Sequence, residues 1–244
     1  MPAGYANHLC VYCQERPSTR IGDHVFARSF FAMNRRAYLP KAPGCMMCGG
    51  RKSELEHYLA TVLPFGGLHA DAVANLETAV PPRLEKNHRL KRELEAGLAV
   101  RSPLAGMTLP FDVTKLHSYF SFVSKGLLWH HWRRYLPATH DAIAFTPPDD
   151  VLPQIADGIL GLNGERLSID LGEGTFRYSV IASPTDPFLT AWFFQLMSGL
   201  QLTGDPERPE AVVSAVVAIT TSHSSIERIK RVWFPADTKR NEGS

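Results

Sequence analysis

The sequence predicts an α+β protein, in which a small metal-stapled N-terminal module precedes an α+β domain with a small antiparallel sheet. All four cysteines lie in two CxxC pairs near the N-terminus, apolar stripes at helical spacing follow them, and apolar residues alternate as in a strand late in the chain. We expect the module over residues 1–67, a basic helical connector over 68–109, an α+β domain of unknown role over 110–236 and a flexible tail over 237–244.

The two cysteine pairs are Cys10-Val-Tyr-Cys13 and Cys45-Met-Met-Cys48, and 31 residues separate them. A CxxC turn directs two thiolates at one centre, so two such turns complete a closed four-thiolate zinc site. Two disulfides would require an oxidising compartment, and a redox CxxC motif would open a helix after a strand. We therefore expect one structural Zn²⁺ bound by all four cysteines.

The module contains one strand, one loop and one helix between and after the cysteine pairs. Ile21–Phe26 has strand-like composition, with Asp23-His24 in its middle. Residues 34–44 are rich in turn formers. A helix is expected from about Arg51 to Leu63, and Pro64-Phe65-Gly66-Gly67 should stop it.

The remainder of the chain mixes helices with a few strands. A basic helix is expected over Pro82–Leu98, and a second over Val113–Tyr135, whose apolar face should be core. That face consists of Leu116, Tyr119, Phe120, Val123 and Leu127. Residues 138–150 favour turns, Phe176–Ala182 alternates as a half-buried strand, Phe188–Leu202 fits either strand or helix, and Ala211–Thr220 resembles a buried strand.

Charge is distributed unevenly along the chain. The formal net charge is +2, but residues 1–101 hold 14 Lys and Arg against 9 Asp and Glu, a net of +5. Residues 102–244 hold 12 against 15, a net of −3, so a polyanion should meet the N-terminal part. No apolar stretch approaches twenty residues, and no secretory or lipidation signal is visible. We expect a cytoplasmic protein without a membrane partner.

The order Cys-x-x-Cys, Asp-His, Cys-x-x-Cys and helix resembles the zinc-stapled branch of the HNH endonucleases, the ββα-metal nucleases. The resemblance covers residues 8–65 and includes the helical segment RKSELEHYL after Cys48. It implies that the four cysteines bind a structural zinc, that Asp23 binds a catalytic divalent metal, and that His24 is the general base. It therefore implies a metal-dependent hydrolase that cleaves phosphodiester bonds of DNA.

The chemistry of these two residue types fits those roles. Phosphodiester hydrolysis needs a positioned nucleophile and relief of charge on the phosphate. A neutral imidazole is a suitable base near pH 7, because its unperturbed pKa is about 6.5. Neighbouring side chains of an extended strand point to opposite faces, so Asp23 and His24 would share one cleft only if a bulge turned both toward it. The family resemblance implies such a turn.

The chain departs from the family pattern after the fourth cysteine. The family usually has Asn or His there as a metal ligand, whereas Gly49 offers no side chain. Ser53, Glu56 and His57 are possible replacements along the helix. The carboxylate of Glu56 suits Mg²⁺ or Mn²⁺, whereas His57 would suit a softer metal. Both can equally be ordinary surface residues. The family's middle Asn has one loosely spaced candidate, Asn34.

Three basic residues are the expected contacts with nucleic acid. Arg51 and Lys52 lie at the expected helix N-terminus, which favours anions, and Arg28 lies in the preceding loop. A solvated loop explains the charge of Arg28 equally well.

Two other classes of function remain open at this level. One is a zinc ribbon that binds nucleic acid or protein without cleaving it. The other is an interaction protein whose α+β domain carries the function, through a protein partner or a second copy of the chain. Asp23-His24 between the knuckles favours the nuclease, and Gly49 favours the rivals. The resemblance also implies a setting in bacterial restriction or phage defence.

Overall fold

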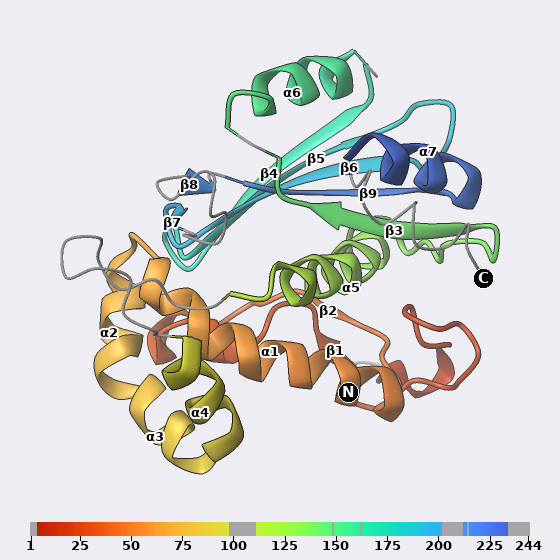
Figure 1. Ribbon diagram of the computed structural model, residues 1–244. Helices are drawn as coiled ribbons and strands as arrows, with labels where there is room; N and C mark the ends of the chain where they lie inside the picture. Colours follow the sequence, from red (N-terminus) through yellow and green to blue (C-terminus); the bar gives the residue numbers. More distant parts are fainter. Residues whose placement is uncertain are drawn as a thin grey trace, which may run out of the picture.

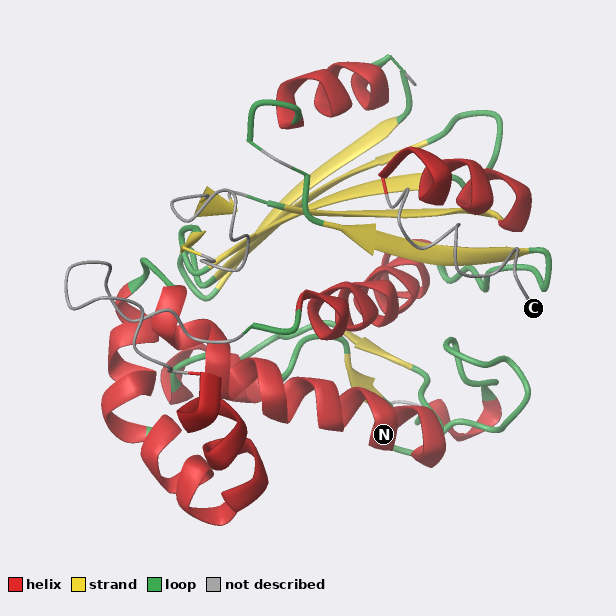
Figure 2. Cartoon of the chain, viewed as in Figure 1, coloured by secondary structure: helices red, strands yellow, loops and turns green. Residues whose placement is uncertain are grey.

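The computed structural model describes residues 4–97, 111–147, 149–161, 163–201, 212–213 and 215–233. The expected tail over 237–244 lies outside these residues. Within them the chain is α+β, with helices and antiparallel strands in separate layers (Figures 1 and 2). The helices are α1 (Met46–Gly66), α2 (Ala70–Thr78), α3 (Val80–Lys86), α4 (His88–Gly97), α5 (Val113–Trp132), α6 (Leu152–Leu160) and α7 (His223–Trp233), with short 3-10 turns η1 (Tyr5–Asn7), η2 (Arg28–Phe30) and η3 (Met33–Arg35).

The main sheet has five strands in the order β3-β9-β6-β5-β4, all antiparallel. Its strands are β3 (His140–Phe145), β4 (Glu165–Leu171), β5 (Phe176–Ala182), β6 (Thr190–Leu196) and β9 (Val216–Ser222). Two ribbons accompany it: β1 (Asp23–His24) with β2 (Lys41–Ala42), and β7 (Leu200–Gln201) with β8 (Val212–Val213). Helix α5 covers one face of the main sheet, and α6 and α7 lie on the other (Figure 1).

Helix α5 lies between the sheet and the N-terminal module and packs against both. It packs against β3 and β9 on one side and against β2 and α1 on the other. The apolar face expected for it is fully buried, as Leu116, Tyr119, Phe120, Val123 and Leu127 are all 0% exposed. Gly126 permits a close approach of α5 to the module, because a Cβ there would lie 2.9 Å from Cγ2 of Val25. One hydrophobic core therefore runs through the module, α5 and the sheet.

A polar junction adds a second connection between the module and the sheet. Arg35 reaches Oδ1 of Asp71 in α2 at 3.0 Å and Oε2 of Glu173, in the turn between β4 and β5, at 2.7 Å. The hydroxyl of Thr175 donates to the other Asp71 oxygen at 2.7 Å. Asp71 is buried and accepts from both sides, so the junction joins the β1–β2 loop, α2 and the sheet.

Helix α1 is longer than the sequence indicated at both ends. It begins at Met46 because Cys45 caps it, its sulfur accepting from the Cys48 N–H at 3.4 Å. It continues past the expected stop at Pro64. A proline cannot donate to the carbonyl four residues earlier, and Nη1 of Arg83 donates to that Ala60 oxygen instead, at 2.7 Å.

The other expected elements were placed with varied accuracy. The single helix expected over Pro82–Leu98 is wrong: it divides at Asn87, whose side chain accepts from the Leu90 N–H at 3.0 Å and caps α4. The strand over Phe176–Ala182 is confirmed as β5. The first strand is shorter than expected and consists of Asp23–His24 alone. The segment Phe188–Leu202 contains strands β6 and β7, and β8 and β9 lie around the expected strand Ala211–Thr220. Strand β3 lies inside the region 138–150, where turns were expected.

Candidate metal centre and the adjoining carboxylate site

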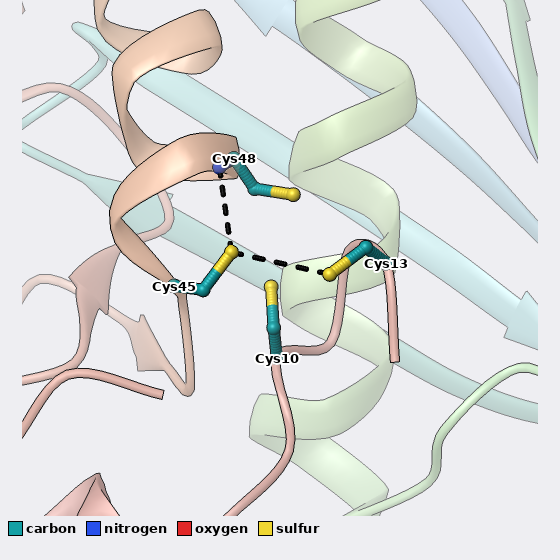
Figure 3. Close-up of side chains that lie close together, drawn as sticks. All are labelled: Cys10, Cys13, Cys45 and Cys48. Carbon is teal, nitrogen blue, oxygen red and sulfur yellow. Dashed lines mark hydrogen bonds between the residues drawn. The ribbon is translucent and has the colours of Figure 1, made fainter. Parts of the chain in front are cut away.

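The four cysteine thiols converge on one point at the N-terminus of α1 (Figure 3). All four sulfurs lie within 4.8 Å of one another, and those of Cys13 and Cys45 are 3.9 Å apart. A tetrahedral zinc with Zn–S bonds of about 2.3 Å separates its sulfurs by about 3.8 Å. The set can therefore hold a metal ion such as zinc. In the part of the chain that the structure describes, it is the one group of three or more potential metal ligands.

The local chain path explains this convergence. Cys10 and Cys13 occupy a turn before β1, where the Gln14 N–H donates to the Cys10 carbonyl at 2.8 Å. Burial raises the pKa of Cys45, but hydrogen bonds from Cys48 and the other thiols outweigh it and lower that pKa to about 7. Burial and the neighbouring thiols raise the pKa of Cys48. A bound cation would favour the thiolate form of all four.

Asp23 and His24 form the strand β1 between the two knuckles. Asp23 pairs with Ala42 and His24 with Lys41, in regular register without a bulge between them. The Asp23 side chain faces the first knuckle, since the Tyr12 hydroxyl donates to its Oδ2 at 2.7 Å. Burial, followed by the charge of Asp23, raises the pKa of Tyr12 well above its usual value, so this hydroxyl remains a donor.

Gly44 allows the chain to turn from β2 into α1 beside this carboxylate. A Cβ at Gly44 would lie 2.8 Å from Cβ of Asp23 and 3.3 Å from the Tyr12 ring. The position next to the second knuckle therefore needs glycine, and the knuckle and Asp23 are held in contact by close packing as well as by the Tyr12 hydrogen bond.

Helix α1 presents Lys52 and Glu56 to Asp23. Cys48, Lys52 and Glu56 are spaced by four residues and so lie along one face of the helix. The Lys52 ammonium donates to the His24 carbonyl oxygen at 2.6 Å and to Oε1 of Glu56, and it lies 3.1 Å from Oδ2 of Asp23. Lys52 is only 1% exposed. Burial raises the pKa of Glu56, and the charge and hydrogen bond of Lys52 oppose that shift.

This arrangement bears directly on the expected catalytic metal. A divalent ion held by both Asp23 and Glu56 would have to lie between their carboxylates. The Lys52 ammonium already contacts both carboxylates there. The residues as arranged therefore do not fit such an ion.

The His24 imidazole is half-buried and has no hydrogen-bond partner among the described residues. Burial lowers its pKa, and the positive charges of Lys41 and Arg28 lower it further, while the Asp23 charge opposes the shift. His24 is consequently neutral at pH 7, which is the form that accepts a proton.

The remaining predicted site residues occupy different surroundings. Arg28 and Arg51 are exposed, at η2 and in the second turn of α1. Lys52 is buried, and its ammonium donates to the His24 carbonyl oxygen. His57 lies apart from Lys52 and Asp23. It lines a cavity of about 480 cubic ångströms together with residues of α4 and α5. Asn34 lies in η3.

Sequence reasoning did not identify the internal roles of Tyr12 and Lys52. Tyr12 lies inside the first CxxC turn, and Lys52 is four residues before Glu56. The sequence does show Lys52 and Glu56 as an i,i+4 pair of opposite charges, but on most helices such a pair lies on the solvated surface.

Comparison with protein-family models, curated proteins and solved structures finds no match to this chain. Among the described residues, every helix is too short or too polar to span a membrane.

Proposed function

We propose that this protein is an HNH-type endonuclease that hydrolyses phosphodiester bonds of DNA. The observation that supports this most directly is the order of β1, β2 and α1 along the chain, although the regular pairing of β1 lacks the bulge that would turn Asp23 and His24 to one side. Asp23-His24 lies on the first strand, and cysteine pairs that converge on one point bracket the ribbon. In this proposal the four cysteines hold a structural Zn²⁺, and cleavage requires Mg²⁺ or Mn²⁺.

His24 is the proposed general base. Burial and the charges of Lys41 and Arg28 lower its pKa, which keeps the imidazole neutral. The imidazole forms no hydrogen bond with any of the described residues. A base must reach the water that attacks phosphorus, and a free, half-buried imidazole on a short ribbon meets that requirement. Arg28 and Arg51 are exposed and are the proposed phosphate contacts.

Lys52 also favours a second candidate, a zinc-stapled module that binds nucleic acid without cleaving it. The ammonium satisfies both nearby carboxylates, and a Cβ at Gly49 would meet nothing within 4 Å. Neither observation supplies a second ligand for a catalytic metal. A non-cleaving module needs none.

Plasmid nicking by zinc-loaded protein separates these candidates. We expect nicking with Mg²⁺ or Mn²⁺ that stops in excess EDTA, and a loss of roughly 10²–10⁴-fold in His24→Ala, the usual contribution of a positioned base. His57→Ala is the matched control, because His57 lies on the side of α4 and α5, and it should nick normally.

Two outcomes oppose the nuclease proposal. Equal nicking by wild type and His24→Ala would exclude His24 as the base. A mobility shift of DNA without nicking under any divalent metal would support the binding module instead.

A further inference from the structure

Strand β4 forms one edge of the main sheet (Figure 1). It pairs with β5 along all seven of its residues, and its other side meets no strand among the residues that the structure describes. An edge strand turns the backbone N–H and C=O groups of every second residue away from the sheet, where another strand can bind them. The open edge of β4 is therefore a candidate site of pairing with another chain.

A row of apolar side chains along β4 is only half-buried. Leu167, Ile169 and Leu171 pack against the hydrophobic core, and each of them pairs with a residue of β5 that is at most 2% exposed. No residue of β4 is itself buried, whereas most of β5 is. The core thus reaches the edge of the sheet and is incompletely covered there. A further strand beside β4 would remove more of this apolar row from water.

The order of residues in β4 favours a second copy of the same strand as the occupant. Two antiparallel copies can be centred on Ser168, so that this residue lies opposite its own copy. Arg166 of each copy then lies opposite Asp170 of the other, which brings unlike charges together at two places. Leu167 likewise lies opposite Ile169, which joins the two apolar rows. Centring the pair on either neighbour of Ser168 would place neither charge opposite an unlike one.

We propose that β4 joins two copies of this chain into a two-fold symmetric dimer, in which the two main sheets form one continuous antiparallel sheet. The interface is self-complementary, as a closed dimer requires. Asp170 keeps its contacts within the chain, with Nε of Arg177 at 2.8 Å and the Gly174 N–H at 2.7 Å, so the charges across the interface extend an existing ion pair.

The proposed pairing also fixes the relative placement of the two N-terminal modules. Residues directly opposite each other in an antiparallel pair point to the same face of the sheet. Helix α5 and the module lie on the face that carries the apolar row of β4. Both modules therefore lie on the same side of the joined sheet. The dimer does not depend on the proposed nuclease function.

Sedimentation equilibrium of the zinc-loaded full chain tests for the dimer. One pair of seven-residue strands is a small interface, so we expect reversible dimerisation with a micromolar dissociation constant. Ile169→Lys places an ammonium opposite Leu167 of the other copy and should raise that constant at least about 10-fold. Val232→Lys is the control, because this side chain of α7 is 70% exposed and lies away from β4, and it should dimerise like wild type.

Cross-linking tests the register of the pair. Ser168→Cys places two thiols opposite each other where Cβ atoms are about 4.5–5.5 Å apart, and mild oxidation should give a disulfide-linked dimer. Ser179→Cys is the matched control, since Ser179 pairs with Ser168 in β5 and lies one strand further from the other copy. It should give no linked dimer.

Two results would overturn the inference. Wild type that stays monomeric throughout the micromolar range would favour a different protein as the occupant of this edge. A dimer that is neither cross-linked in Ser168→Cys nor weakened in Ile169→Lys would show that another surface joins the two copies.

Discussion

Two clusters on the same face of α1 solve one electrostatic problem in different ways. At its N-terminus four thiols lie within 4.8 Å of one another, and one turn further on two carboxylates converge on Lys52. Buried groups that carry negative charge require a cation nearby. The thiols can hold a metal ion from solution, whereas the carboxylates receive a cation from the chain itself. A metal ion and a lysine ammonium are thus alternative means of balancing the negative charge of a buried cluster.

The difference also determines how each cluster responds to change. A metal site depends on all its ligands and on the supply of the ion. A site closed by a lysine depends on the packing that buries the lysine, here by α1, β1 and Tyr119 of α5. Three perturbations test the two clusters, the connection between them and the adjoining His24, in decreasing order of expected effect.

Cys45→Ser should produce the largest loss. Structural zinc contributes about 10–16 kcal/mol of apparent binding free energy in zinc-finger peptides, so losing one of four ligands should destabilise the module strongly. Zinc content should fall below one ion per chain, and the melting temperature should fall with it. Met46→Ser, at a neighbouring side chain that is 83% exposed, is the control and should alter neither. Full zinc content with an unchanged melting curve in Cys45→Ser would show that the thiols do not form one site.

Tyr12→Phe tests whether the two clusters are joined. It removes the hydrogen bond to Oδ2 of Asp23 and leaves the ring packed against Phe122. A hydrogen bond to a charged group contributes about 1.5–3 kcal/mol, so the urea midpoint should fall while zinc content stays at one ion per chain. The exposed hydroxyl of Tyr38 provides the control, Tyr38→Phe. If Tyr12→Phe unfolds at the wild-type urea concentration, the hydroxyl contributes nothing to the connection.

The pH dependence of nicking should give the smallest effect. Only neutral His24 accepts a proton, and burial, Lys41 and Arg28 lower its pKa below 6.5. Activity should therefore persist as pH falls to 6.5 and decline only below it, as pH passes through the folded pKa. Lys41→Gln removes one of the nearby positive charges and should move this decline toward 6.5, whereas Lys86→Gln, on an exposed side chain of α3, should not. A decline that Lys41→Gln leaves in place would assign the titration to another group.

The cysteine cluster could be predicted from sequence because its chemistry is local. Each CxxC turn places two potential ligands close together, and cysteines at this spacing indicate a metal site. The contacts of Lys52 could not be predicted, because an i,i+4 Lys–Glu pair has the same sequence on a surface as in a core. Burial of Lys52 depends on Tyr119 and the His24 carbonyl, 67 and 28 positions away in the chain.

The same distinction holds for the fold. The apolar face of α5 and the alternation of β5 are local patterns, and both were predicted correctly. Strand β3 was missed in a segment rich in turn formers, because its pairing with β9 decides its conformation, and Thr221 pairs with Asp141 across 80 residues. The extension of α1 through Pro64 likewise depends on Arg83, which no local pattern around the proline contains.

The close packing of Gly126 against Val25 has a consequence for how this protein can be divided. Helix α5 supplies part of the hydrophobic core of the N-terminal module and also covers the sheet. Cutting the chain after residue 67 would remove that helix and expose side chains such as Phe30, which packs on Tyr119. The segment that carries the four cysteines therefore does not have a complete hydrophobic core of its own and could not be moved alone into another protein. Recombination would have to move it together with α5.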